Sequence, residues 1–63
     1  MGNFIRLAAV KRKTGLSKSS IYQMMNLGNF PTSISIGTRA VAWDEEEIDE
    51  WAHIKVAESR NKK

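Results

Sequence analysis

The side chains best suited to chemistry in this chain are the cationic and hydrogen-bonding groups of one short segment. At about 100° per residue, a helix over residues 18–27 has two distinct faces. The polar face carries Lys18, Ser19, Tyr22, Gln23 and Asn26. Such a face suits contacts with the base edges and phosphates of double-stranded DNA in the major groove. The alternative interpretation is an ordinary solvated helix face.

The residues just before this segment predict a turn between two helices. Gly15 can take the left-handed conformation that ends a helix, and Ser17 is a good N-cap for the next one. Lys18 then falls at the first helical position, where a positive charge opposes the helix dipole. A phosphate held against this helix N-terminus would explain a lysine there. The opposite face of the helix is expected to be core, with Ile21, Met24, Met25 and Leu27.

A first helix is expected over residues 7–14, before the turn. Its last turn contains Lys11, Arg12 and Lys13. Positive charge stabilises a helix C-terminus, so helix stability alone is one explanation of these residues. The other is contact with the DNA backbone, which we assign to Arg12 and Lys13 as a supporting role. Before this helix, Phe4 and Ile5 suggest a short extended segment that packs against a later part of the chain.

After the second helix the hydrophobic period changes from 3.6 to 2, which predicts a β-hairpin. The alternation favours Ile34 opposite Trp43 and Ile36 opposite Val41, with residues 37–40 as the turn. Thr38 and Arg39 would then lie at the tip. A basic hairpin tip beside a helix-turn-helix has the form of a wing, placed for a minor groove or a phosphate. A solvated turn arginine is the alternative.

A third helix is expected from about residue 44. Asp44 and Glu47 have the spacing of a capping box, and Ile48 and Trp51 lie on the face expected to pack inward. Consecutive carboxylates fan out around a helix, so no metal site is expected from this acidic run. After about Ala57 we expect a frayed helix end, with a single domain over residues 1–58 and a polar basic tail over residues 59–63.

The net charge of +3 hides a strong asymmetry. Residues 1–43 contain six cations and no acid, whereas residues 44–63 contain all seven acids against four cations. This distribution points to a polyanionic partner for the first two thirds of the chain. With 63 residues, no cysteine and one histidine, we expect neither an enzyme, a cofactor nor a metal site. No apolar run suggests a membrane span or a signal peptide, so a cytoplasmic location is expected.

Four motifs, in order and spacing, resemble the AlpA family of small phage and prophage DNA-binding regulators. They are residues 14–22 (TGLSKSSIY), 28–31 (GNFP), 37–43 (GTRAVAW) and 48–51 (IDEW). The family is related to excisionases and to the DNA-binding part of MerR-type proteins. One departure is Gln23, where family members often carry a basic residue.

The resemblance implies a mostly helical α+β fold, a winged helix-turn-helix of three helices and a two-stranded wing. It also implies a regulator of an integrase gene, an excision factor that bends DNA for an integrase, or both. A single module of this size buries limited DNA surface, so cooperative self-association on repeated sites is expected. The alternative is a protein-interaction module that recruits an integrase or an RNA polymerase without reading DNA.

Overall fold

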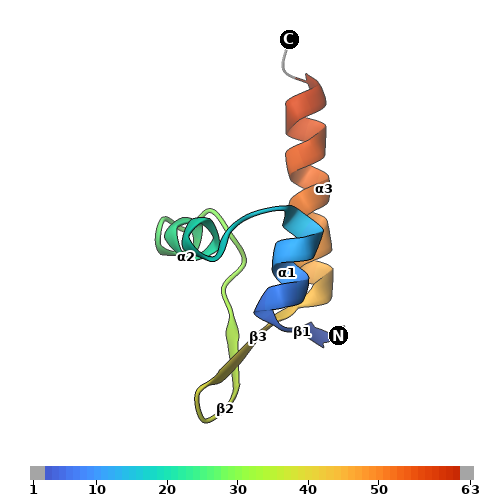
Figure 1. The fold of residues 1–63 in the computed structure, drawn as a ribbon. Coiled ribbons are helices and arrows are strands. Elements are labelled where there is room, and N and C mark those ends of the chain that lie inside the picture. Colours follow the sequence, from blue (N-terminus) through green and yellow to red (C-terminus); the bar gives the residue numbers. More distant parts are fainter. Residues whose placement is uncertain (1–2, 62–63) are drawn as a thin grey trace.

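The computed structural model describes residues 3–61, which form three helices and three strands (Figure 1). The elements in chain order are β1 (Phe4–Ile5), α1 (Leu7–Thr14), α2 (Lys18–Asn26), β2 (Ile34–Gly37), β3 (Ala40–Asp44) and α3 (Glu45–Asn61). This is the mostly helical α+β, winged-helix architecture that the sequence predicts. Within the described residues, no helix is both long and apolar enough to cross a membrane.

The sheet has three strands, with β3 in the centre and β1 and β2 at its edges. The extended segment before α1 is β1, which pairs antiparallel with β3 through Phe4 opposite Asp44 and Ile5 opposite Trp43. The backbone N–H of Glu45 also donates to the carbonyl of Asn3 at 2.8 Å. The predicted two-stranded wing is therefore tied at its base to the start of the described chain.

The predicted register of the hairpin is wrong by one residue. Ile34 lies opposite Ala42, Ser35 opposite Val41 and Gly37 opposite Ala40. The turn needs only two residues, and a bulge between Ser35 and Gly37 absorbs the extra residue, Ile36. Because side chains alternate between faces, Ile34 shares a face with Ala42 and not with Trp43. Ile36, which the predicted register placed opposite Val41, is 43% exposed.

The predicted junction between α1 and α2 is confirmed in detail. Gly15 has a φ of 74° and donates its N–H to the carbonyl of Lys11 at 2.7 Å. The Ser17 hydroxyl accepts the Ser20 N–H at 3.2 Å, so Ser17 caps α2. Thr14 reinforces the turn, because its hydroxyl donates to the Val10 carbonyl and accepts the Leu16 N–H. The start of α2 is thus fixed relative to α1 by local hydrogen bonds.

The core lies between the two helices of the junction, the sheet and the base of α3. Its buried cluster consists of Val10, Ile21, Phe30, Trp43 and Ile48. The Trp43 indole N–H is satisfied by the Pro31 carbonyl at 3.2 Å. Leu27, predicted to belong to the core face of α2, is instead 66% exposed at the helix C-cap. The chain leaves α2 there through Gly28, whose φ is 78°.

The last helix begins as predicted and ends later than predicted. Asp44 caps α3, since its Oδ1 accepts the Glu46 N–H at 3.0 Å. The helix continues through Ala57 to Asn61, so the residues expected to be frayed are helical up to that point. The last two residues of the expected basic tail, Lys62 and Lys63, lie outside the described residues. The C-terminal part of α3 projects away from the rest of the fold (Figure 1).

Candidate nucleic-acid interface

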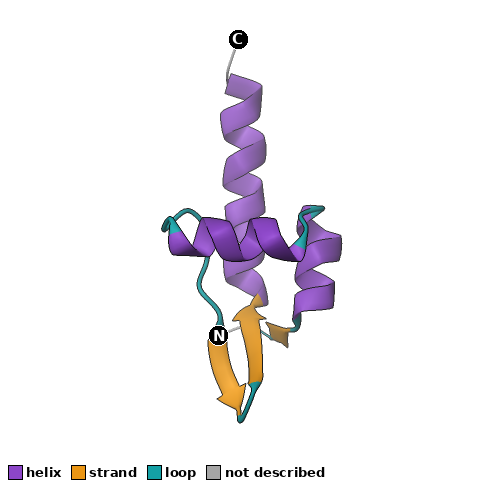
Figure 2. Ribbon diagram, turned by 60° about the vertical axis from the view of Figure 1, so that its left-hand side comes forward, coloured by secondary structure: helices purple, strands orange, loops and turns teal. Residues whose placement is uncertain are grey.

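Two elements project from the body of the molecule on the side away from α3. Figure 2 shows α2 crossing in front of α3, with the β2–β3 hairpin below it. Both elements start from rigid supports: α2 from the capped junction, and the hairpin from the three-stranded sheet. The exposed face of a short helix therefore stands beside an extended hairpin.

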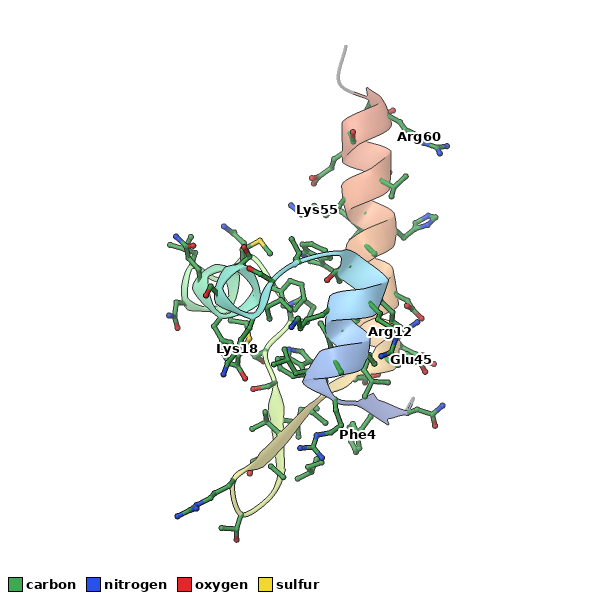
Figure 3. All side chains as sticks on the ribbon, viewed as in Figure 1. Phe4, Arg12, Lys18, Glu45, Lys55 and Arg60 are labelled. Atoms are coloured by element: carbon green, nitrogen blue, oxygen red, sulfur yellow. The ribbon has the colours of Figure 1, made fainter. Side chains whose placement is uncertain are left out.

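The polar face predicted for α2 is largely present. Lys18 is exposed at the first position of α2 (Figure 3). Ser19, Gln23 and Asn26, further along the helix, are exposed as well. The first turn of α2 contains no acidic residue. Its free backbone N–H groups and the Lys18 ammonium therefore form a positive end with no carboxylate to neutralise it.

Tyr22 differs from the other residues assigned to this face. Its side chain is half-buried, and its ring meets that of Trp43 edge-on, with the centroids 6.2 Å apart and the planes at 67°. Edge-to-face pairs of this kind add stability beyond the burial of their area. Tyr22 therefore packs against the core as well as standing beside the exposed residues of α2.

The hairpin tip consists of Thr38 and Arg39, and both are exposed. Arg39 has a φ of 61° and is the one non-glycine residue with positive φ in the described chain. Gly37, the residue before this tip, does not have a positive φ. The left-handed conformation costs a residue with a Cβ about 1–2 kcal/mol. The chain therefore keeps an arginine where a glycine would be less strained.

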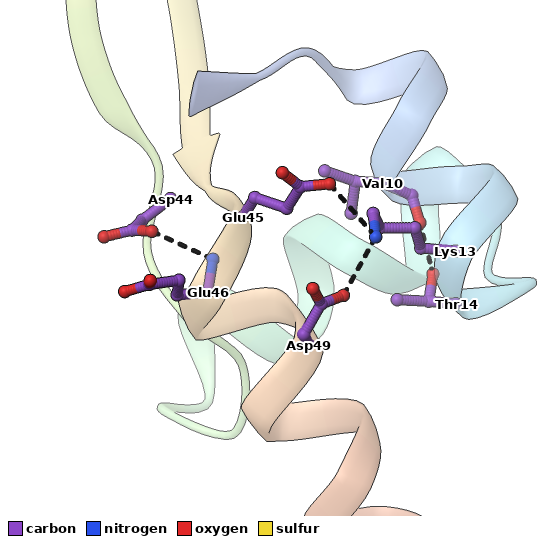
Figure 4. A network of polar contacts seen from close by, with 7 residues as sticks. All are labelled: Val10, Lys13, Thr14, Asp44, Glu45, Glu46 and Asp49. Carbon is purple, nitrogen blue, oxygen red and sulfur yellow. Dashed lines mark hydrogen bonds and ion pairs between the residues drawn. The ribbon is translucent and has the colours of Figure 1, made fainter. Parts of the chain in front are cut away.

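The two cations assigned to α1 have different surroundings. Arg12 is exposed and forms no ion pair with the described residues. Lys13 Nζ lies 2.9 Å from Asp49 Oδ1 and 3.2 Å from Glu45 Oε2, both at the start of α3 (Figure 4). Hydrogen bonds from the ammonium to these carboxylates, with Asp49 contributing most, raise the pKa of Lys13 above 10.5. Lys13 thus joins α1 to α3.

Two further exposed cations were not assigned to a site from the sequence. Arg6 precedes α1 and Lys11 lies on it; both are exposed. Like Lys18 and Arg39, they form no ion pair within residues 3–61. Their signal in the sequence was the absence of acids before residue 44. Over the same described residues, no group of three acids or histidines is arranged to hold a metal ion.

A capped helix-turn-helix, a basic hairpin and a cationic exposed face together define a winged helix-turn-helix module. Comparison with known proteins agrees with this class. The model of the family described as Prophage CP4-57 regulatory protein (AlpA) matches residues 3–56. The chain belongs to the AlpA family.

Two relatives illustrate the similarity. An uncharacterized protein, ORF88, of Enterobacteria phage P4 is 37% identical over 54 residues, which cover 86% of this chain and 61% of that protein. The DNA-binding transcriptional activator AlpA of Escherichia coli (strain K12) is 40% identical over 53 residues, covering 75% of this chain and 76% of AlpA. The chain thus spans less than two thirds of the length of the phage P4 protein.

Proposed function

We propose that this protein is a sequence-specific DNA-binding regulator of a phage or an integrated mobile element. In this proposal α2 enters the major groove, and Lys18, Ser19, Gln23 and Asn26 face bases and phosphates there. The hydroxyl edge of Tyr22 lies beside them. Arg39 and Thr38 of the wing contact the minor groove or the backbone, and Arg12 adds a backbone contact from α1.

The observation that carries this proposal is the strained position of Arg39. A positively charged side chain occupies the tip of the hairpin although its φ of 61° favours glycine. Strain held at one exposed residue is typical of functional positions. The exposed Arg39 guanidinium forms no ion pair within residues 3–61, and such a group is well suited to a phosphate or a narrow minor groove.

Lys13 has a different role in this proposal from the one expected from the sequence. Its ammonium is engaged by Glu45 and Asp49, so we assign it to holding α1 and its neighbour Arg12 in place. A direct contact of Lys13 with phosphate would require it to leave two carboxylates. Lys11 forms no such pair within residues 3–61 and supplies further positive charge for a polyanion.

We further propose regulation of transcription, excision of the element, or both. Transcription is supported by the relative from Escherichia coli, which is described as a transcriptional activator. Excision would use the same DNA-binding surface at an attachment site, with an integrase as partner. The two activities differ in the DNA that is bound and not in the surface that binds it.

A gel-shift titration tests the proposal. The protein is titrated against the integrase promoter and the attachment-site DNA of its source element, with excess unrelated DNA as competitor. Lys18→Ala and Arg39→Ala are each expected to weaken binding about tenfold, the effect of one charge-assisted contact. Arg60→Ala, at the far end of α3, is the matched control and should bind like the wild type (Figure 3).

The DNA fragment that shifts separates the two activities. Specific bands on the promoter would support transcriptional control, and bands on the attachment site would support excision. Binding that survives in competitor DNA but is indifferent to both substitutions would contradict the proposed surface. Failure of every fragment to shift at low salt would contradict DNA binding itself.

A further inference from the structure

A groove of about 530 Å³ lies between the α2–β2 loop and α3. Its apolar lining includes Phe30, Trp51 and Ile54. Its acidic lining consists of Glu47 and Glu50 on α3. Lys55 also lines the groove, but its ammonium is paired with Glu58 at 3.5 Å. The groove thus combines an aromatic and aliphatic surface with two negative charges and one positive charge that already has a partner.

The aromatic part of the groove is fixed in place by its own contacts. The Trp51 indole N–H donates to the Asn29 carbonyl at 2.8 Å. The Phe30 ring meets the Trp51 ring edge-on, with centroids 4.7 Å apart. Lys55 Nζ lies 5.8 Å from the centre of the Trp51 ring. A ligand would therefore find the surface already shaped, which lowers the entropic cost of binding.

Three further lining residues, Glu47, Glu50 and Ile54, are exposed in the part of the chain that is described. Ile54 is 46% exposed. Glu47 and Glu50 take part in no ion pair with another described residue, whereas Glu45, Asp49 and Glu58 all do. An occupant that satisfies the groove would bring an apolar side chain and a positive charge close to each other.

The start of the described chain carries this combination. Phe4 has its backbone paired in β1, yet its side chain is 56% exposed. Arg6, two residues later, is also exposed and forms no ion pair within residues 3–61. Neither side chain belongs to the proposed DNA-reading face of α2 or to the wing tip. Phe4 can supply the apolar anchor and Arg6 the charge for Glu47 or Glu50.

We propose that the groove binds the Phe4–Arg6 segment of a second copy of this chain. On one molecule the two surfaces are far apart: Phe4 lies near the base of α3, and Lys55, beside the groove, lies higher along that helix (Figure 3). The contact is therefore heterologous, with different patches on the two copies. A dimer of this kind leaves one groove and one segment free, so further copies can add in a row.

This contact deepens the proposed function, because it gives a physical basis for cooperative binding to neighbouring sites on DNA. A groove of this size and one short segment make a contact well below the area of a stable interface, so the free protein is expected to be a monomer at micromolar concentration. Two copies on adjacent sites are held at a high effective concentration, and the same weak contact then becomes significant.

A disulfide experiment without DNA tests the contact directly, since the chain has no cysteine of its own. Asn3→Cys is exposed beside Phe4, and Thr32→Cys is exposed in the lining of the groove. The two variants, mixed at high concentration under mild oxidation, are expected to form a mixed dimer. Asn3→Cys with Val56→Cys, an exposed position that does not line the groove, is the matched control.

The proposal requires that Phe4→Thr, introduced into the Asn3→Cys chain, reduces the yield of the first mixed dimer about tenfold or more. Equal yields for the Thr32 and Val56 pairs, or a yield indifferent to Phe4, would overturn it. Circular dichroism checks that each variant is folded, and only folded variants enter the comparison of mixed-dimer yields. Because DNA is absent, this result does not depend on DNA binding.

A second measurement links the contact to DNA. Fluorescence anisotropy compares one binding site with two adjacent sites, using the wild type and the uncharged substitutions Phe4→Thr and Ile54→Gln. Both variants should bind one site like the wild type but lose the cooperativity on two sites, about tenfold in affinity, within the usual range of coupling between sites. Normal one-site binding with unchanged cooperativity in both variants would refute the contact and leave the proposed function intact. If the wild type did not bind the single site, the proposed function would be refuted instead.

Discussion

The ammonium of Lys13 on α1 lies 2.9 Å from the carboxylate of Asp49 on α3, while its neighbour Arg12 has no such partner among residues 3–61. Two adjacent cations are thereby divided between two roles. One joins two helices through an ion pair, and the other remains available to an external anion. The division depends on which side of α1 faces the acidic start of α3.

Substitution of these two residues should separate stability from DNA binding. Lys13→Met should lower the free energy of unfolding and leave DNA affinity close to that of the wild type. Arg12→Gln should weaken DNA binding and leave the free energy of unfolding nearly unchanged, because it removes an exposed cation but no ion pair among the described residues. Chemical denaturation and fluorescence anisotropy on the same samples measure both quantities. A loss of DNA affinity in Lys13→Met that equals that of Arg12→Gln would show that Lys13 contacts DNA.

The Lys13 ion pairs also predict a dependence of stability on pH. The pKa of Lys13 is raised above 10.5 in the folded state, so the folded state holds this proton more tightly than the unfolded state. The stabilisation is therefore complete below pH 10.5 and is lost as the pH rises through the higher, folded pKa. The difference in unfolding free energy between wild type and Lys13→Met should be constant near neutral pH and should shrink above pH 10.5. Denaturation series from pH 7 to pH 11 measure it, and a difference that does not decrease at all above pH 10.5 would contradict the assignment.

Arg39 should show a conflict between stability and binding. Arg39→Gly relieves the strain at a φ of 61°, whereas Arg39→Ala keeps it. Arg39→Gly is expected to be more stable than Arg39→Ala by about 1 kcal/mol, and both should lose about the same DNA affinity. Thermal unfolding and anisotropy provide the comparison. If Arg39→Gly bound DNA like the wild type, the guanidinium would have no part in the interface.

Tyr22 is predicted to contribute through both its ring and its hydroxyl. Tyr22→Phe keeps the edge-on contact with Trp43 and should leave the unfolding free energy nearly unchanged, but it should weaken DNA binding. Tyr22→Ala also removes the ring and should destabilise the fold by about 3 kcal/mol, at the lower end for an aromatic side chain because Tyr22 is only half-buried. Thermal unfolding measures the change in stability, and fluorescence anisotropy measures the DNA affinity. Full DNA affinity in Tyr22→Phe would limit Tyr22 to a packing role.

The salt dependence of binding should count the phosphate contacts. About six contacts would lower the affinity on the order of a thousandfold between 50 and 200 mM salt. Lys18→Ala should reduce the slope of log affinity against log salt by about one, because one cation is lost. Anisotropy titrations at four salt concentrations determine the slope. An unchanged slope in Lys18→Ala would mean that Lys18 does not contact a phosphate.

The parts of the fold that depend on local chemistry could be predicted from the sequence. Gly15 and Ser17 each have one strongly preferred role at a helix end, so the turn and the start of α2 followed from them. Asp44 determined the start of α3 in the same way. The buried positions of Ile21 and Ile48 followed from the hydrophobic period of their helices.

The features that the sequence analysis missed depend on contacts distant in sequence. The hairpin register depended on a bulge and on the positive φ of Arg39. No residue in the hairpin is of a type that signals either feature in the sequence. The pairing of Lys13 with Asp49 joins residues 36 positions apart, and helix position alone left its role open. The groove beside Trp51 forms only where the α2–β2 loop meets α3, so no single segment signals it.

The pairing of Phe4 with Asp44 also bears on how the protein folds. The helix-turn-helix and the hairpin each close over a few residues and can form early. The strand β1 must instead bring together positions 40 residues apart, and its two residues repay little of that loop-closure entropy. We therefore expect β1 to dock last, after the wing and the junction have formed. The slowest step in folding would then be the one that ties the wing to the start of the described chain.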